Sequence, residues 1–313
     1  MQRVLVIGAG AMGCLFAARL RESGADVMLI DIDTERLARI ADQGITLTDD
    51  RGTRTVPLRT GTAREAAGPF DLVLLFTKGM HSAAAIASVA SLATEGGPYV
   101  LTLQNGLGNP EAILEHFPAA RVLKGIAALP ADLHDATHVS SHGSGHLELG
   151  PMVPDGMGAA REAAALLARA GFDARASADV DIAIWEKVAF NAALNALGAI
   201  TLLPNAGLDN APGRRIAAAI VAEVVATAHA SGVPVDRARI DQAIDFALTH
   251  HGAHQASMLQ DRLAGRASEI ETIQGAVCAR ATALGVPTPV TATMSDLIRL
   301  IEGARDGSPS APR

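Results

Sequence analysis

Three side chains on one apolar stretch of the chain could do chemistry together. The segment WEKVAFNAALNALGAI has an apolar helical pattern, yet it carries Lys187, Asn191 and Asn195 at intervals of four residues. Steps of four rotate by about 40° on an α-helix, so the three side chains share one stripe. An ammonium group can stabilise the charge that builds on a carbonyl oxygen during hydride transfer and then donate a proton. The two carboxamides can orient a bound molecule without adding charge.

The stripe also has an ordinary explanation. An isolated lysine on a helix usually lays its aliphatic stem on the surface and keeps its charge in water. The two carboxamides that share the stripe with Lys187 argue against this explanation, because their surroundings are otherwise apolar. Each would cost about 1–3 kcal/mol if it were buried without a hydrogen-bond partner. We therefore interpret the three residues as a candidate catalytic site.

A glycine-rich turn near the start of the chain is typical of dinucleotide binding. The hexapeptide GAGAMG places Gly8, Gly10 and Gly13 in the G-x-G-x-x-G spacing, directly after a strand-like run and before a helical pattern. The first glycine permits a tight turn, the second lets the backbone approach a pyrophosphate, and the third allows close packing of the helix. We expect this turn, including Ala11 and Met12, to bind the cofactor. A purely structural turn would share the spacing.

Asp31 is the candidate that would choose between the two nicotinamide coenzymes. It ends the strand-like run DVMLID, eighteen residues after Gly13. A carboxylate at this position binds the adenosine ribose hydroxyls of NAD, and its charge repels the 2′-phosphate of NADP. Alternatively, Asp31 is a solvated residue before a helix capped by Asp33 and Thr34, and Arg36 on that helix could reach a phosphate. The sequence favours NAD(H), with NADP(H) as the alternative.

These residues need a fold that brings the ends of several strands together. Short apolar runs rich in β-branched residues predict strands, and helical patterns lie between them. The strands are expected at residues 3–7, 26–31, 71–77 and 99–105, and the helices at 11–24 and 81–93. This alternation predicts an α/β fold with an N-terminal, Rossmann-type, doubly wound parallel sheet.

The second half of the chain has a different character. Residues 121–150 alternate apolar and polar positions and predict antiparallel edge strands, and strand-like runs cease near residue 177. Helical patterns follow at 182–202, 212–231, 236–250, 256–284 and 290–303. We therefore predict three parts: a dinucleotide-binding domain at 1–176, an all-helical substrate or dimerisation domain at 177–303, and a flexible tail at 304–313.

The composition limits the classes of function. A chain of 313 residues usually forms more than one domain, and 49% hydrophobic with 19% charged residues is typical of a globular protein. A net charge of −7, a pI near 5.8 and the lack of a basic patch argue against nucleic-acid and acidic-lipid partners. No signal-peptide or membrane-span pattern is recognised, so we expect a soluble, cytoplasmic protein.

Neither cysteines nor histidines predict a metal site. Cys14 and Cys278 are far apart and lack the spacing of a zinc site or a disulfide framework. The chain has ten histidines, some of them grouped in THHGAH at 249–254. No carboxylate or cysteine lies at a spacing that completes a ligand set, so we expect the histidines to be loop residues and the protein to hold no metal.

Six motifs, taken in order, resemble the ketopantoate reductase (2-dehydropantoate 2-reductase) family over nearly the whole chain. They are GAGAMG, TKGMH at 77–81, LQNGLG at 103–108, WEKVAFNAALNALGA at 185–199, SMLQD at 257–261 and EIETIQG at 269–275. The glycine motif is shared with β-hydroxyacid dehydrogenases, whereas the last four together are more specific. The resemblance implies NAD(P)H-dependent reduction of 2-dehydropantoate to pantoate by hydride transfer.

The resemblance also implies roles for single residues of the apolar stretch. Lys187 resembles the family's catalytic lysine, which acts as general acid. Asn191 and Asn195 resemble the asparagines that help to hold the substrate, a small 2-keto acid. With the lysine in the second domain and the nicotinamide held by the first, the reaction is expected in the cleft between the two domains.

Four more residues take roles from the resemblance. Asn105 resembles the asparagine beside the nicotinamide and the reacting carbonyl, and Lys78 the lysine that lines the cofactor site. Ser257 resembles the serine that binds the substrate carboxylate, and Glu269 the glutamate that binds its hydroxyl end. Taken alone, each has an ordinary explanation as a strand cap, a turn residue or a helix-surface residue. Asp31 departs from the family, because members that use NADPH commonly carry a basic residue there.

Several functions stay open on the sequence alone. The leading hypothesis is reduction of 2-dehydropantoate. A paralogue acting on a different 2-keto or 2-hydroxy acid is the nearest rival, and an enzyme that chooses NAD could run in the oxidative direction. A non-catalytic nucleotide sensor could use the same fold, although a sensor has no need of a proton donor such as Lys187. The apolar helices could pair two chains in a homodimer, and the sequence does not decide between monomer and dimer.

Overall fold

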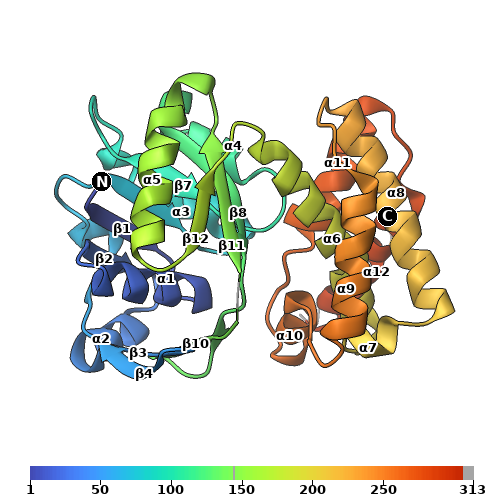
Figure 1. Ribbon diagram of the computed structural model, residues 1–313, viewed down its shortest axis with the longest axis horizontal. Coiled ribbons are helices and arrows are strands. Elements are labelled where there is room, and N and C mark those ends of the chain that lie inside the picture. The colour runs from blue at the N-terminus through green and yellow to red at the C-terminus, as the bar shows by residue number, and fades with distance from the viewer. Residues whose placement is uncertain (144, 306–313) are drawn as a thin grey trace. The chain divides into compact units, whose positions relative to one another are not determined.

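The computed structural model describes residues 1–143 and 145–305, which divide into two compact units (Figure 1). Unit 1 contains Met1–Gln104 and Asn109–Val180. Unit 2 contains Asn105–Gly108 and the chain from Asp181 on. The predicted tail at 304–313 begins inside the last helix, which runs to Arg305, and its remainder lies outside the described residues.

The centre of unit 1 is an eight-stranded sheet in the order β12-β11-β8-β7-β6-β1-β2-β5. Its strands are β1 (Arg3–Ile7), β2 (Asp26–Ile30), β5 (Arg59–Gly61), β6 (Leu72–Leu75), β7 (Tyr99–Thr102), β8 (Val122–Ala128), β11 (His146–Pro151) and β12 (Asp173–Ala176). Neighbouring strands are parallel except for β8 and β11, which are antiparallel. The predicted α/β class with a parallel N-terminal sheet is confirmed.

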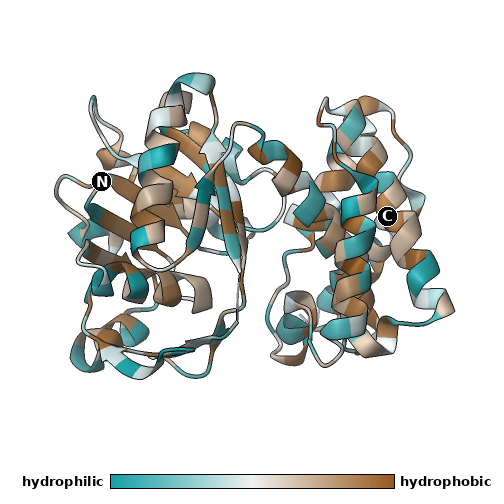
Figure 2. Cartoon of the chain, viewed as in Figure 1, coloured by the Kyte–Doolittle hydropathy of each residue, from teal (hydrophilic) through white to brown (hydrophobic). Residues whose placement is uncertain are grey.

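Helices cover both faces of this sheet. Successive residues of a strand point to opposite sides, so one strand contributes side chains to two cores. Val4 and Val6 belong to a core cluster with residues of α1 and α5, whereas Leu5 and Ile7 pack with residues of α3 and α4. The central strands β1, β6 and β7 are therefore largely apolar (Figure 2). The helices of unit 1 are α1 (Ala11–Glu22), α2 (Thr34–Gln43), α3 (Ser82–Ser88), α4 (Asn109–Leu114) and α5 (Met157–Arg169).

Short 3-10 turns interrupt the connections of unit 1. They are η1 (Ala63–Glu65), η2 (Gly79–His81), η3 (Ala90–Leu92), η4 (Ala119–Arg121) and η5 (Pro154–Gly156). The helix predicted at 81–93 is therefore shorter than expected, because η2 precedes α3 and η3 follows it.

The prediction of antiparallel edge strands at 121–150 is only partly right. β8 and β11 do pair antiparallel, but β12 covers the outer side of β11, so neither is an edge strand. The rest of this region joins a second sheet in the order β4-β3-β10-β9, in which β10 is parallel to β3. The strands of this sheet are β3 (Ile45–Asp49), β4 (Gly52–Val56), β9 (Asp132–Leu133) and β10 (His138–Ser141).

The histidines do not all lie in loops, as the sequence analysis expected. His138 lies in β10, His146 begins β11, and His250 ends α9 (Arg237–His250). The strands of His138 and His146 pair with segments elsewhere in the sequence, so the local pattern around these two histidines did not reveal the strands.

Among the residues that the structure describes, unit 2 has helices joined by loops and contains no strand. Its helices are α6 (Val180–Thr201), α7 (Asn205–Leu208), α8 (Ala211–Ala230), α9, α10 (Ser257–Leu263), the π-helical turn η6 (Glu271–Gly275), α11 (Ala276–Leu284) and α12 (Pro289–Arg305). Alanine, valine, leucine and isoleucine side chains of these helices form one buried core around α6.

The single helix predicted at 256–284 is wrong. The chain leaves the helix after Leu263, where Gly265 adopts a φ of +68°, and Arg266 binds Asp261 through both its backbone amide and its guanidinium group. Glycine tolerates this left-handed conformation, which ends a helix. The helical structure resumes only at η6, so Glu269 lies in the interruption.

Two glycines of the first turn test how closely α1 packs. A Cβ on Gly13 would lie 1.7 Å from the Gly8 carbonyl oxygen, whereas a Cβ on Gly10 would meet nothing within 4 Å. We expect Gly13→Ala to lower the free energy of unfolding by at least about 3 kcal/mol and Gly10→Ala to change it by less than about 1 kcal/mol. Urea denaturation of both variants measures this, and equal midpoints would contradict the packing of α1 on the turn.

Candidate active site

The glycine turn between β1 and α1 leaves room for a phosphate group. Gly8 has a φ of +106° and donates from its amide to the Ile30 carbonyl oxygen at 2.8 Å, which holds the turn against β2. Gly10 precedes α1 as its N-cap, and the space beside its Cα is open. Ala11 and Met12 form the first turn of the helix, where amide groups and the helix dipole favour an anion. This geometry fits a dinucleotide pyrophosphate.

The carboxylate of Asp31 is fixed at the end of β2. One oxygen accepts from the Ala9 amide at 2.5 Å and the other from the Asp33 amide at 3.0 Å. A carboxylate has about four acceptor positions, so both oxygens can accept further hydroxyl groups. Asp33 caps α2 as expected, by accepting from the Arg36 amide at 3.0 Å. The arrangement fits a ribose with two free hydroxyls.

The Ala9 carbonyl oxygen joins this turn to two further side chains. It accepts a hydrogen bond from the Arg36 guanidinium group at 3.1 Å and from the Cys14 thiol at 3.3 Å. Burial raises the pKa of Cys14 to about 12, so this thiol stays protonated at neutral pH. Cys14 is therefore a structural residue of the turn, and Arg36 lies next to the position that Asp31 occupies.

Lys78 follows β6 and precedes η2, where it is half-buried. A network that the sequence analysis missed holds this connection in place. The carboxamide nitrogen of Gln104 donates to the Thr77 carbonyl oxygen at 2.5 Å and to the Ser82 hydroxyl at 2.8 Å, and its oxygen accepts from the Thr102 hydroxyl at 2.8 Å. Gln104 follows β7 at its carboxyl end, where ligands bind in open α/β sheets, and this position was the available signal.

The polar stripe of the sequence lies on α6. Lys187 and Asn191 are half-buried, and Asn195 is 3% exposed. The Asn195 amide nitrogen has no hydrogen-bond partner among the described residues. A buried donor of this kind is costly, and a bound ligand is one way to satisfy it.

Three predicted residues come together in unit 2 although they are distant in the sequence. The side-chain carboxamide nitrogen of Asn105 donates to a Glu269 carboxylate oxygen at 3.2 Å. Burial lowers the pKa of Lys187 to about 8, and the negative charge of Glu269 opposes this by favouring the ammonium form. Lys187 thus remains protonated at neutral pH but can release its proton at little cost. The group can bind a polar substrate and deliver one proton.

The segment Asn105–Gly108 packs against η6. The Leu107 amide donates to the Thr272 carbonyl oxygen at 2.8 Å. Gly106 has a φ of +87°, and a Cβ at this position would lie 2.1 Å from the same oxygen, so only glycine fits. The sequence showed the Asn-Gly pair as a turn signal but did not reveal which element the turn contacts.

Ser257, another predicted site residue of unit 2, lies on a different helix from Lys187. It is exposed at the first position of α10, whose N-cap is Ala256. Among the described residues, no hydrogen bond or ion pair joins Ser257 to Lys187, Asn105 or Glu269. A substrate carboxylate at Ser257 therefore remains a prediction from the family resemblance.

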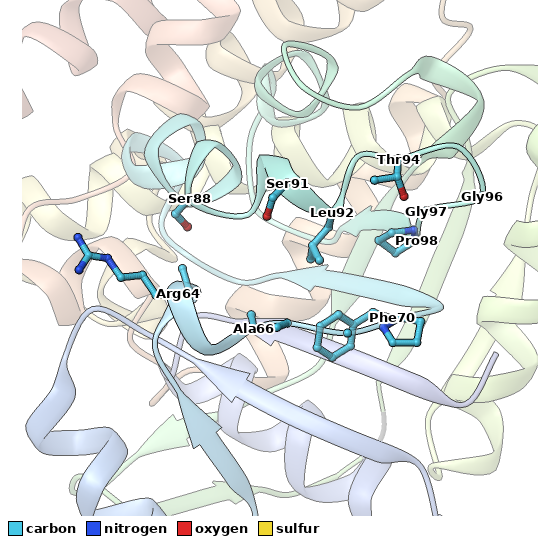
Figure 3. Close-up of a pocket in the computed structure, with 14 residues that line it drawn as sticks. Arg64, Ala66, Phe70, Ser88, Ser91, Leu92, Thr94, Gly96, Gly97 and Pro98 are labelled. Carbon is cyan, nitrogen blue, oxygen red and sulfur yellow. The ribbon is translucent and has the colours of Figure 1, made fainter.

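A separate hollow of about 650 Å³ lies in unit 1 (Figure 3). Phe70 and Pro98 line it at the amino ends of β6 and β7, with Arg64, Ser88 and Thr94 around them. β1 runs parallel to β6, so the glycine turn at the carboxyl end of β1 is at the opposite edge of the sheet. The hollow contains none of the predicted site residues.

Within residues 1–143 and 145–305, no three histidine, cysteine, aspartate or glutamate side chains are grouped so that they could hold a metal ion. In the same residues, no helix has both the length and the apolar character needed to span a bilayer.

Comparison with known proteins identifies the family to which the chain is similar. Residues 4–154 match the family model described as ketopantoate reductase PanE/ApbA, and residues 179–302 match the model of its C-terminal part. The 2-dehydropantoate 2-reductase of Halobacterium salinarum is 32% identical over 307 residues, which cover 97% of this chain and 100% of the relative.

Solved structures agree with this family. A 2-dehydropantoate 2-reductase from Geobacter metallireducens is 32% identical, with a TM-score of 0.89 over 95% of this chain and 99% of the other. A ternary structure of D-mandelate dehydrogenase with NADH and anilino(oxo)acetate is 27% identical, with a TM-score of 0.93 over 97% of this chain and 100% of the other. The chain belongs to the ketopantoate reductase family, whose members are NAD(P)-dependent oxidoreductases that act on CH–OH groups.

Proposed function

We propose that this protein reduces 2-dehydropantoate to pantoate with NADH, and that Lys187 donates the proton. The observation that carries the proposal is the group in unit 2, where the half-buried Lys187 has a lowered pKa and lies in the field of Glu269, and Glu269 accepts from Asn105. The Halobacterium salinarum relative, which carries the name of this activity, supports the choice of substrate.

The residues of the chain divide the work of the reaction. Bound NADH supplies the hydride. The glycine turn holds the pyrophosphate, Asp31 binds the adenosine ribose, and Lys78 and Asn105 line the nicotinamide side of the cofactor. Lys187 stabilises the negative charge on the carbonyl oxygen and then protonates it.

The substrate is held by polar groups of unit 2. Asn191 and Asn195 orient the keto acid, and the unpartnered amide of Asn195 gains an acceptor when the substrate binds. Ser257 binds the carboxylate and Glu269 the hydroxyl end of the substrate. Each group adds hydrogen bonds without a second positive charge, so Lys187 remains the main electrophile.

A second candidate function is oxidation or reduction of a different 2-hydroxy or 2-keto acid. The D-mandelate dehydrogenase structure, which contains NADH, favours it through a TM-score of 0.93. Asp31 favours it as well, because a preference for NAD suits an enzyme that runs in the oxidative direction. The lysine, the asparagines and the fold would serve both functions equally. A comparison of reaction rates with different substrates therefore distinguishes the two functions.

Steady-state kinetics with a panel of acids tests the proposed substrate. We expect kcat/KM for 2-dehydropantoate with NADH to exceed that for phenylglyoxylate and other 2-keto acids by at least about 100-fold, because a pocket that hydrogen-bonds the substrate hydroxyl rejects acids that lack it. A higher kcat/KM for an aromatic keto acid would instead support the second candidate. Turnover of no acid by protein that binds NADH would contradict both.

The pKa of Lys187 predicts the pH dependence of reduction. Only the protonated lysine can donate, so kcat/KM should be level below pH 8 and fall tenfold per pH unit above it. Lys187→Ala should lower kcat by at least about 100-fold while the Kd for NADH stays unchanged. Lys187→Arg is the matched control, since arginine keeps the charge and does not release its proton below about pH 12.

For Lys187→Arg we expect a low rate without the fall above pH 8. A variant that keeps both the wild-type rate and the wild-type pH profile would remove Lys187 from the mechanism.

Asp31 predicts the preference for NADH. Asp31→Ala removes an acceptor for the ribose hydroxyls and a charge that repels the 2′-phosphate of NADPH. We expect the ratio of kcat/KM with NADH to that with NADPH to fall by at least about tenfold, equivalent to about 1.4 kcal/mol. Asp33→Ala, which removes a neighbouring carboxylate that caps α2, is the control and should leave the ratio within about twofold. An unchanged ratio in Asp31→Ala would show that Asp31 does not read the ribose.

A further inference from the structure

Gln274 is a fully buried carboxamide in the π-helical turn η6, and no role assigned so far explains it. The residue is 0% exposed. Its amide nitrogen donates to the Ala192 carbonyl oxygen of α6 at 3.1 Å, and its oxygen has no hydrogen-bond partner among the described residues. A leucine or methionine would fill the same space without an unsatisfied oxygen. A buried polar group that is only half satisfied calls for a reason.

The hydrogen bond of Gln274 reaches the polar stripe of α6. Ala192 directly follows Asn191 and lies one turn before Asn195. The carbonyl group that Gln274 holds is therefore part of the helical turn between the two asparagines. Lys187 lies on the preceding turn of the same helix.

The turn η6 holds the other half of the candidate site. Glu269 is two residues before it, and the Thr272 carbonyl oxygen accepts from the Leu107 amide at 2.8 Å. Asn105 and Leu107 both belong to the segment Asn105–Gly108, and the Asn105 side chain donates to Glu269 at 3.2 Å. Gln274 thus donates a hydrogen bond that links η6 to the helix that carries Lys187.

The backbone of η6 departs from a regular α-helix. The Gly275 amide donates to the Ile270 carbonyl oxygen at 2.9 Å, five residues back, which is the hydrogen bond of a π-helix. π-helical turns carry one extra residue, are rare, and occur often at functional sites. A side-chain bond to α6 can hold such a turn in place, and a change to a regular helix would move the neighbouring Glu269.

We propose that Gln274 is a positioning residue that fixes η6 on α6, holds Glu269 in place relative to Lys187 and limits the access of water to the lysine. The substrate-free part of this proposal does not depend on the reaction, whereas its kinetic consequence rests on the proposed function. Burial lowers the pKa of Lys187 more strongly than the charge of Glu269 raises it. Loosening η6 admits water and relieves the stronger effect.

The lysine content of the chain makes a direct measurement practical. Lys78, Lys124 and Lys187 are its three lysines, so labelling with ε-¹³C-lysine gives three NMR signals. The signal of Lys187 is the one that disappears in Lys187→Arg. In the wild type we expect it to titrate with a pKa of about 8. In Gln274→Met, which keeps the side-chain length and removes both polar atoms, the pKa should rise by at least about one unit.

Thr291→Val is the matched control. Thr291 is also 0% exposed in unit 2, and its hydroxyl donates to Glu223 at 2.6 Å at the start of α12. This variant should lower the melting temperature and leave the titration of Lys187 unchanged. A shift of the same size in Thr291→Val would overturn the proposal, because the effect would then come from general loosening of the unit.

A wild-type titration in folded Gln274→Met would overturn the proposal as well. If Gln274→Met does not fold, Gln274→Asn takes its place, since it keeps the amide but is too short to reach Ala192, and the same shift is expected. In an active enzyme, the fall of kcat/KM on the alkaline side should move with the titration while the Kd for NADH stays constant. The NMR titration uses no substrate, so it tests Gln274 even if the proposed reaction fails.

Discussion

The candidate site in unit 2 depends on the partial burial of one ammonium group, that of Lys187. Taking the Lys187 charge out of water is unfavourable, and Glu269 returns only part of that cost, so the pKa falls from 10.5 to about 8. Such a shift corresponds to about 3 kcal/mol. Because the folded pKa lies below the unfolded one, this cost is absent above pH 10.5, grows as the pH falls from 10.5 to 8, and is fully present below pH 8. At neutral pH the apolar core around α6 must offset the cost, which explains why so polar a stripe lies on so apolar a helix.

Much of this arrangement could be predicted from local sequence patterns. The alternation of strand-like and helical runs predicted the parallel sheet, because buried parallel strands are apolar on both faces and residues such as Val4 and Leu5 serve opposite cores. The glycine spacing predicted a turn that the positive φ of Gly8 and the tight approach at Gly13 require. The interval of four residues predicted that Lys187 and its asparagines share a face of α6. Each of these features depends on residues that are neighbours in the sequence.

The features that could not be predicted depend on contacts between distant segments. The second sheet pairs β10 with β3, which are about ninety residues apart, and no local pattern reports that partnership. The break after Leu263 depends on Gly265 and on the pairing of Arg266 with Asp261, whereas the helical period continues through it. Gln104 and Gln274 look like ordinary polar residues in sequence. Their importance comes from what they hold, a strand connection in one case and a carbonyl group of α6 in the other.

The four residues Asn105–Gly108 have a consequence for the modularity of the chain. They are encoded within the first half, yet they belong to the helical unit and supply the donor for the Thr272 carbonyl oxygen. The helical unit is therefore not one continuous stretch of sequence. A fragment that starts at Asp181 lacks this segment, and recombination between relatives at that boundary would combine the loop of one parent with the π-helical turn of another. The loop and the π-helical turn must remain compatible with each other. A substitution in one therefore constrains the other, although the loop is encoded in the first half of the gene.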